Sequence, residues 1–217
     1  MRKKAVRILN IFKPKKLKEY ICTKLRRISP CRCVNLLKLK KFNAQIGENL
    51  QINGKIQLHS NKKINKGDFI IGDNVTLNSD YRKYNPIGFT SPVLFRFKYG
   101  GKIKIGKNVG ISNATIVSYK ENVIIDDYVM LGGGVKIYNT DFHSIDFENR
   151  VFRPDDDIAC KTVHIKEGAF IGAGSIILKG VTIGEKAVIG ANSVVTKSVP
   201  DGEIWAGNPA KFIKKMQ

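Results

Sequence analysis

Residues 165–199 read IKEGAF IGAGSI ILKGVT IGEKAV IGANSV VTKSV, a run in which every sixth residue is aliphatic. The aliphatic positions are Ile165, Ile171, Ile177, Ile183, Ile189 and Val195. An amphipathic helix repeats about every 3.6 residues and a hairpin sheet about every two, so neither produces this unbroken period. Short strands that form the sides of a triangular coil do produce it, because each hexad sends one aliphatic side chain inward. The repeat therefore predicts an all-β solenoid, a β-helix.

The same spacing recurs upstream in shorter runs that begin at Ile46, Ile71, Ile105 and Ile125. The changes of register between these runs indicate insertions, and an insertion in a solenoid leaves the stack as a loop. Two of the predicted insertions are long, at residues 79–101 and 142–162.

Residues 79–101 are rich in aromatic side chains, and residues 142–162 contain His143 and the acidic run Asp155–Asp157. Loops that leave a solenoid usually gather on its binding face. Long surface loops are also tolerated at small thermodynamic cost. Both interpretations, a site and a neutral surface loop, therefore stay open for these two segments.

Length and composition predict one main domain. The chain has 217 residues, of which 42% are hydrophobic and 20 are glycine, and this suits a turn-rich solenoid with a sizeable core. We expect a basic, partly helical N-terminal arm at residues 1–41, a β-helix at residues 42–200 and a C-terminal tail at residues 201–217. No apolar stretch has the length of a membrane span or of a secretory signal. Four cysteines in a chain of this length favour free thiols, and so a cytoplasmic protein.

Positive charge is concentrated near the N-terminus. The formal net charge is +20, and residues 1–41 contain fifteen Lys or Arg residues but one acidic residue, Glu19. Apolar residues recur at helical spacing from Leu17 to Ile28. A basic amphipathic helix can lie on an anionic membrane surface, and it can equally cap the open first coil of a solenoid. No recognised nucleic-acid module accompanies the charge, so no nucleic-acid partner is expected.

Three histidines are the main candidates for proton transfer. His59 and His164 lie within hexads, where surface or inter-coil packing is the simpler interpretation. His143 lies where the hexad pattern breaks and a long loop begins, and histidine is the side chain best suited to accept a proton near neutral pH. Asp141 and Asp146 are close enough in sequence to orient its ring. Spacing alone does not choose between these carboxylates or exclude a backbone carbonyl.

Three segments resemble a known family. Residues 170–184 (FIGAGSIILKGVTIG), 188–197 (VIGANSVVTK) and 199–211 (VPDGEIWAGNPAK) are similar to the late coils and tail of the hexapeptide-repeat acyltransferases. The nearest branch is the galactoside and maltose O-acetyltransferases, together with enzymes that acetylate surface polysaccharides. The resemblance covers about residues 103–215. It implies a left-handed parallel β-helix, acetyl-CoA as acyl-donor substrate with no metal, a saccharide acceptor, and a homotrimer with active sites between subunits.

The resemblance also implies roles for individual residues. His143 takes the position of the general base, and Asn113 and Asp141 are expected on the acceptor side. Ala173 is expected to donate its backbone N–H to the thioester oxygen, as a developing oxyanion requires. The residues expected to bind the CoA donor are Ala173, Ala191, Thr196, Lys197, Lys211 and Lys214. The resulting expectation is an O-acetyltransferase of surface polysaccharide assembly, cytoplasmic and peripheral to the inner membrane face through residues 1–41.

Other functions remain open at this stage. The nearest alternative is N-acetylation of a nucleotide-linked amino sugar, because an amine acceptor could use the same base. A nonenzymatic β-helical scaffold or binding protein is an alternative of a different class. A zinc-dependent carbonic anhydrase can share the solenoid, but it requires three histidines on the metal, and His59 is far in sequence from His143 and His164. A serine acetyltransferase usually carries a larger N-terminal helical domain than this arm could form.

Overall fold

The computed structural model of the chain describes residues 30–80, 82–153 and 157–216. Most of the basic N-terminal arm therefore lies outside the described residues, including the amphipathic helix predicted from Leu17 to Ile28. The same holds for two residues of the acidic run, Asp155 and Asp156.

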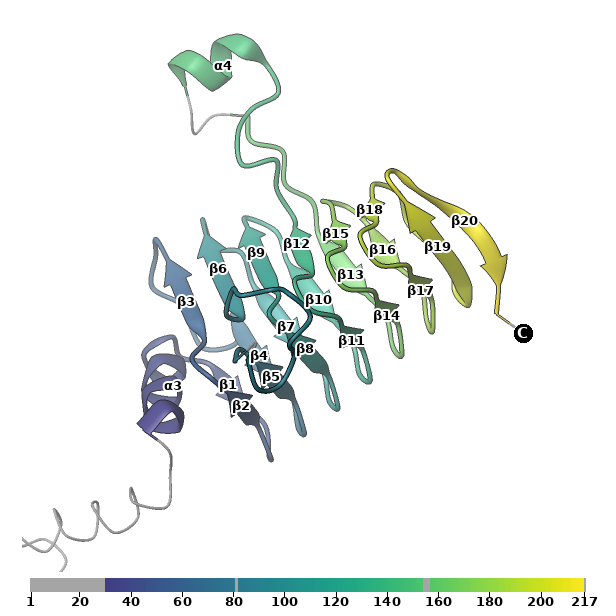
Figure 1. Cartoon of the computed structure of the whole chain (residues 1–217). Helices are drawn as coiled ribbons and strands as arrows, with labels where there is room; N and C mark the ends of the chain where they lie inside the picture. Colours follow the sequence, from purple (N-terminus) through teal and green to yellow (C-terminus); the bar gives the residue numbers. More distant parts are fainter. Residues whose placement is uncertain (1–29, 81, 154–156, 217) are drawn as a thin grey trace, which may run out of the picture.

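The described residues wind into a β-helix with three flat faces, A, B and C (Figure 1). Face A contains β1 (Gln45–Ile46), β4 (Phe69–Ile71), β7 (Ile103–Ile105), β10 (Val123–Ile125), β13 (Val163–Ile165) and β16 (Thr182–Ile183). Face B contains β2 (Gln51–Asn53), β5 (Thr76–Asn78), β8 (Gly110–Ser112), β11 (Met130–Leu131), β14 (Phe170–Ile171), β17 (Val188–Ile189), β19 (Glu203–Gly207) and β20 (Ala210–Lys215). Face C contains β3 (Gln57–Ser60), β6 (Leu94–Lys98), β9 (Thr115–Tyr119), β12 (Lys136–Tyr138), β15 (Ile176–Ile177) and β18 (Val194–Val195).

The aliphatic positions of the hexads form the core. Parallel pairing aligns Ile125 with Ile165 and Ile165 with Ile183 on face A, and it aligns Leu131 with Ile171 on face B. All these side chains are buried. The predicted fold is confirmed as a left-handed parallel β-helix. Strands β19 and β20 depart from the parallel pattern, since they pair antiparallel as a C-terminal hairpin.

Helix α3 (Pro30–Lys41) lies against the open first coil (Figure 1). Leu39 is fully buried in the core. Asn35 Nδ2 donates to Gly54 O at 2.8 Å, and Lys38 Nζ donates to Ile56 O at 2.7 Å. The C-terminal part of the arm thus covers exposed strand edges at this end of the solenoid. Among the described residues, no helix combines the length and apolar character needed to cross a membrane.

Two segments leave the stack. The first, called here the aromatic insertion, spans residues 79–93 and is shorter than the predicted range of 79–101, because β6 rejoins face C at Leu94. The prediction missed β6 because Phe95 and Phe97 occupy its inward positions in place of aliphatic residues, and both are buried in the core. The second, called here the histidine loop, spans residues 139–162. It projects from the β-helix and contains α4 (Phe147–Phe152) (Figure 1).

Candidate functional site

The histidine loop leaves the β-helix at the edge between faces C and A, directly after Tyr138. The buried Asn139 fixes the start of this loop. Its Oδ1 accepts from Tyr119 N at 2.8 Å, and its Nδ2 donates to Glu121 O at 2.8 Å. His143 follows four residues later and its side chain is exposed. The loop is thus anchored where it leaves the β-helix, and it presents an accessible imidazole, as a general base requires.

Neither carboxylate that the sequence placed near His143 orients its ring. Asp141 Oδ1 lies 2.7 Å from Lys179 Nζ, and Asp146 Oδ1 accepts from Asn149 N at 2.9 Å as the N-cap of α4. No hydrogen bond or ion pair joins the His143 ring to another residue within the described ranges. Within one chain, Asp141 therefore pairs with a lysine of the next coil and Asp146 caps α4.

The edge between faces B and C carries two of the residues expected to bind the CoA donor, Ala173 and Ala191. Ala173 and Ala191 occupy equivalent turns of successive coils, and Asn192 N donates to Ala173 O at 2.8 Å. Gly172 permits this stacking, since a Cβ there would lie 2.5 Å from Ala191 N. The backbone N–H groups of Ala173 and Ala191 donate to no described residue. Two fixed, unpaired donors in a row can bind the carbonyl oxygens of an extended ligand.

The aromatic insertion covers part of this B–C edge. A Cβ built on Gly134 would overlap the ring of Phe89, and one built on Gly174 would lie 3.2 Å from Phe89 Cζ. These glycines belong to the two neighbouring coils, and Gly174 directly follows Ala173. The Phe89 ring therefore packs against Gly134 and Gly174, and Gly174 belongs to the turn that contains Ala173.

Asn113 lies beneath the aromatic insertion at the same edge. Its side chain is 1% exposed, and its Nδ2 donates to Ser91 O at 2.8 Å. Its Oδ1 is buried without a hydrogen-bond partner among the described residues. The side-chain oxygen of Asn113 is thus free to accept a hydrogen bond. The aromatic insertion would have to move before a sugar could reach it.

Of the other residues expected to bind the CoA donor, Thr196 and Lys197 lie apart from Ala173, whereas Lys211 pairs with Ala206, which lies beside Gly190 in the turn of Ala191. Thr196 and Lys197 follow β18 at the C–A edge, and Lys211 and Lys214 lie on β20; all four are exposed. The B–C and C–A edges are separated by the width of face C, roughly 13 Å for four residues of strand. Within one chain, Asn113, Ala173 and Ala191 share one edge, whereas His143, Thr196 and Lys197 share the other.

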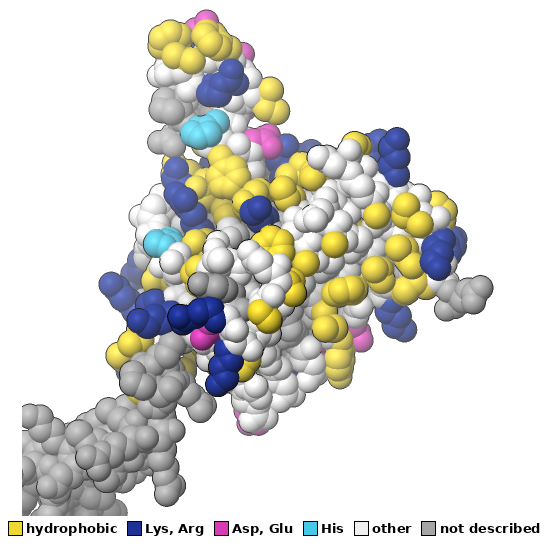
Figure 2. Space-filling view, in the orientation of Figure 1, with side chains coloured by type: hydrophobic (Ala, Val, Ile, Leu, Met, Phe, Trp, Pro, Cys, Tyr) yellow, Lys and Arg dark blue, Asp and Glu magenta, His cyan; other side chains and the backbone are white. Residues whose placement is uncertain are grey.

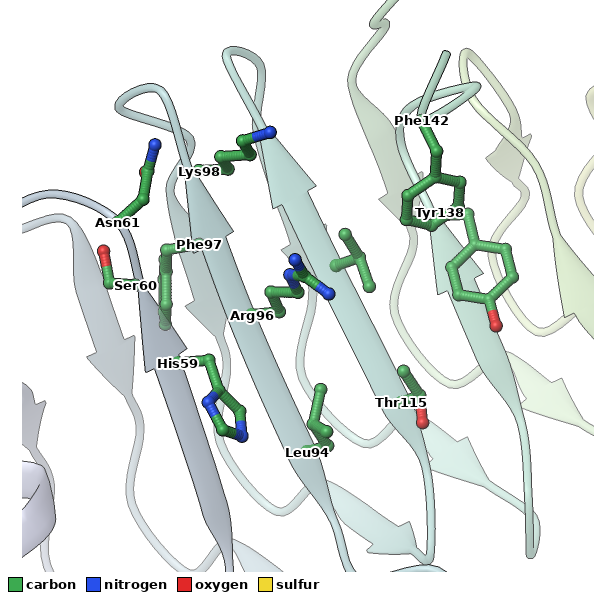
Figure 3. A pocket seen from close by; sticks show the side chains of 11 residues that line it. His59, Ser60, Asn61, Leu94, Arg96, Phe97, Lys98, Thr115, Tyr138 and Phe142 are labelled. Atoms are coloured by element: carbon green, nitrogen blue, oxygen red, sulfur yellow. The ribbon is translucent and has the colours of Figure 1, made fainter.

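Face C carries an open pocket of about 510 Å³ between these edges (Figure 3). The side chains that define it are His59, Leu94, Arg96, Lys98, Tyr138 and Phe142. Sequence reasoning missed this pocket and assigned His59 to the plain surface. One signal was present: residues 94–98 read LFRFK, whose alternation puts two cations on the outer face of a half-buried strand.

The third histidine has a structural contact. His164 Nε2 lies 2.7 Å from Oδ2 of Asp126, which directly follows the neighbouring strand β10, and this is the inter-coil packing that the hexad position suggested. In the part of the chain that the structure describes, no group of three or more His, Cys, Asp or Glu side chains is arranged to hold a metal ion.

Comparisons with known proteins were made by family and by structure. The family model of the bacterial transferase hexapeptide (six repeats) matches residues 162–197, the coils that contain Ala173 and Ala191. A search of the curated proteins by sequence finds no match.

Solved structures share the fold. The N-acyltransferase AntD from Bacillus cereus, in complex with dTDP and 3-hydroxybutyryl-CoA, has a TM-score of 0.64 and 25% identity, over 84% of this chain and 87% of that protein. The polySia-specific acetyltransferase NeuO has a TM-score of 0.55 and 27% identity, over 79% of this chain and 75% of its own. A hexapeptide-repeat acetyltransferase from Vibrio cholerae has a TM-score of 0.56 and 19% identity, over 92% and 88% of the two chains.

Proposed function

We propose that this chain, a member of the hexapeptide-repeat acyltransferases, transfers an acetyl group from acetyl-CoA to a hydroxyl of a saccharide. The observation that carries the proposal lies in the coils that match the transferase repeat: they present the unpaired N–H groups of Ala173 and Ala191 at one edge. Solved relatives of the same fold bind coenzyme A or its thioesters. The polySia specificity of NeuO supports a role in surface polysaccharide modification.

The chemistry assigns a role to each group. His143 accepts the proton of the acceptor hydroxyl as the oxygen attacks the thioester carbonyl. The tetrahedral oxyanion accepts a hydrogen bond from the Ala173 amide, which is held in place by the coil. Collapse of this intermediate forms the ester, and the departing CoA sulfur takes the proton from the imidazolium. Lys211 and Lys214 are positioned on the C-terminal hairpin to bind phosphates of the donor.

This chemistry requires a second copy of the chain. His143 and Ala173 lie at opposite edges of face C, too far apart to act on one acyl group within a single chain. The projecting tip of the histidine loop also carries exposed apolar side chains (Figure 2). Among them are Ile145, which is 78% exposed, and Phe152, which is 70% exposed. Apolar surface of this kind favours burial against a partner. We therefore propose a homotrimer in which the histidine loop of one copy approaches the B–C edge of the next.

N-acylation of a nucleotide-linked amino sugar is the second candidate. AntD, an N-acyltransferase, superposes with a higher TM-score than NeuO and has been solved with dTDP-4-amino-4,6-dideoxyglucose and coenzyme A. A general base at the position of His143 would serve an amine as well as a hydroxyl. The product separates the two reactions, because mild alkali hydrolyses an O-acetyl ester and leaves an N-acetyl amide intact.

We propose that the basic N-terminal arm binds anionic lipid at the inner membrane face. Residues 1–29 contain eleven Lys or Arg residues and one acidic residue, and each cation near such a surface contributes about 1 kcal/mol. Deleting these residues while keeping α3 should weaken binding to anionic vesicles and leave turnover of a soluble acceptor unchanged. Equal vesicle binding by the truncated protein would contradict this role.

Thermal unfolding tests the donor assignment. Acetyl-CoA at about 100 times its dissociation constant should stabilise the fold by roughly 2.7 kcal/mol, and ATP serves as the charge control. Stabilisation by acetyl-CoA alone supports a donor site, whereas an equal shift with both ligands indicates that basic residues merely collect phosphates. If neither ligand shifts the unfolding temperature of the folded protein, the result would contradict the acyltransferase proposal and favour a nonenzymatic β-helical scaffold.

A further inference from the structure

The pocket on face C is built from four neighbouring coils, which contribute β3, β6, β9 and β12. On β6, Phe95 and Phe97 point into the core, so Leu94, Arg96 and Lys98 face outward. His59 on β3 lies on one side of this strand, and Tyr138 on β12 lies on the other, beyond β9 (Figure 3). The pocket is a concave surface across strands far apart in sequence, which is typical of a ligand site rather than of a random surface depression.

Aromatic rings form one wall of the pocket. The Tyr138 and Phe142 ring centroids are 5.1 Å apart, and those of Tyr119 and Phe142 are 5.7 Å apart, both in edge-to-face geometry. Burial raises the pKa of the Tyr138 phenol, so this hydroxyl stays protonated at neutral pH and can donate a hydrogen bond. Aromatic rings with a polar end provide flat, rigid surfaces against which an apolar sugar face can pack.

Cations occupy the same pocket. Arg96 Cζ lies 6.0 Å from the Tyr119 ring centroid, and Lys98 Nζ lies 5.4 Å from it. Among the side chains that line the pocket there is no Asp or Glu, and Arg96 forms no ion pair with any described residue. A guanidinium held against a ring, with its N–H fork directed into a pocket that lacks carboxylates, is suited to bind a carboxylate or a phosphate.

We propose that the face-C pocket binds the acceptor and that the acceptor is an anionic saccharide, whose charge comes from a sugar carboxylate or from a carrier phosphate. Arg96 binds the charged group, and the Tyr138 and Phe142 rings contact the sugar. Phe142 lines the pocket and directly precedes His143 in the chain, so a saccharide bound here contacts the residue next to the candidate base. This assignment rests on the proposed function and adds the class of acceptor to it.

Ligand binding to the full-length chain tests the assignment. Calorimetric titration at about 0.15 M salt would compare trigalacturonate, which carries carboxylates, dTDP-glucose, which carries phosphates, and neutral maltotriose. The variants are Arg96→Gln and Arg96→Lys, with Lys104→Gln as the matched control. Lys104 is an exposed cation on β7 of face A, so its loss removes the same charge from a surface outside the pocket. Acetyl-CoA stabilisation of every variant is measured in parallel.

We expect at least one anionic probe to bind more tightly than maltotriose. Arg96→Gln should weaken that probe about tenfold, as loss of a charge-assisted hydrogen bond predicts. Arg96→Lys should be intermediate, and Lys104→Gln should have no effect. The probe that binds identifies carboxylate or phosphate as the source of the charge. Acetyl-CoA should stabilise all variants equally, because the proposed donor residues lie outside this pocket.

Three results would overturn the assignment. The first is equal affinity for charged and neutral probes, and the second is an equal loss in the Arg96→Gln and Lys104→Gln variants. The third is loss of acetyl-CoA stabilisation in Arg96→Gln, which would show that the pocket binds the phosphates of the CoA donor. If acetyl-CoA fails to stabilise the unmodified protein while Arg96-dependent binding persists, the pocket binds an anionic saccharide, but the proposed acyltransferase function fails and the ligand is not its acceptor.

Discussion

Lys179 Nζ lies 2.7 Å from Asp141 Oδ1, and this ion pair ties the base of the histidine loop to the next coil of the β-helix. Both side chains are about one-quarter exposed, at 25% and 24%. The second oxygen of the Asp141 carboxylate is buried without a hydrogen-bond partner among the described residues. The pair thus holds the chain two residues before His143, the proposed base.

Breaking this pair should misplace His143. We expect Lys179→Met to lower kcat about ten- to a hundredfold, because small displacements of a catalytic group are costly. Stabilisation by acetyl-CoA should be unchanged. Steady-state kinetics and thermal unfolding with acetyl-CoA measure the two effects. Lys186→Met, an exposed lysine in another turn, is the control. A kcat equal to that of the control variant would show that the ion pair does not position the base.

The Phe89 ring should limit the length of the acyl group. It packs against Gly174, the residue after Ala173, whose N–H is proposed to bind the thioester oxygen. Phe89→Ala should therefore raise kcat/KM for butyryl-CoA relative to acetyl-CoA by about tenfold, the discrimination that one or two methylene groups give in a filled pocket. Tyr84→Ala, on the same insertion but 45% exposed, should leave the ratio unchanged. An unchanged ratio in Phe89→Ala would place the acyl group elsewhere.

Asn139 should be important for stability. Its side chain is fully buried and bonds the backbone of Tyr119 and Glu121 at the start of the histidine loop. Asn139→Ala leaves the buried N–H of Tyr119 without its acceptor, so we expect a loss of about 1–3 kcal/mol in the free energy of unfolding. Urea denaturation measures it, with the partly exposed Asn122→Ala as the control. A loss below about 0.5 kcal/mol, typical of surface substitutions, would contradict the prediction.

Acid should destabilise the fold through two carboxylates, the partly exposed Asp73 and the exposed Asp201. The backbone N–H of Glu48, followed by the Lys107 ammonium, lowers the pKa of Asp73, and the backbone N–H of Glu185 lowers the pKa of Asp201. A folded-state pKa below the unfolded value stabilises the fold above about pH 4. That contribution is lost as the pH falls through the lowered folded-state values.

Urea unfolding at pH 5 and pH 3 measures this dependence. The double variant Asp73→Asn/Asp201→Asn should lose less stability between these two pH values than the unmodified protein loses. An identical loss in both proteins would assign the acid sensitivity to other groups.

The β-helix was predictable from the sequence because its rule is local: each strand contributes one inward aliphatic residue, as Ile171 and Ile189 do. The rule fails where another residue type fills the core. Phe95 and Phe97 fill the core in place of aliphatic residues and are fully or almost fully buried. Because they break the aliphatic pattern, the repeat assigns their strand to an insertion.

The site was less predictable, because it depends on stacking between coils. His59, Arg96 and Tyr138 are far apart in sequence and meet only when β3, β6 and β12 lie on one face. Orientation of the base was also beyond a local pattern. Asp141 is two residues from His143, yet it pairs with Lys179, thirty-eight positions later in the chain.

The rate of coenzyme A release from acetyl-CoA, measured with a saccharide acceptor in the unmodified protein and in His143→Ala, tests the central claim most directly. His164→Ala is the matched control, since His164 contacts Asp126 and is remote from the proposed chemistry. We expect His143→Ala to reduce acceptor-dependent turnover about 10²- to 10⁴-fold, as loss of a general base predicts, while acetyl-CoA still stabilises the fold. Turnover in His143→Ala equal to that in His164→Ala would contradict the account and place the base on another residue.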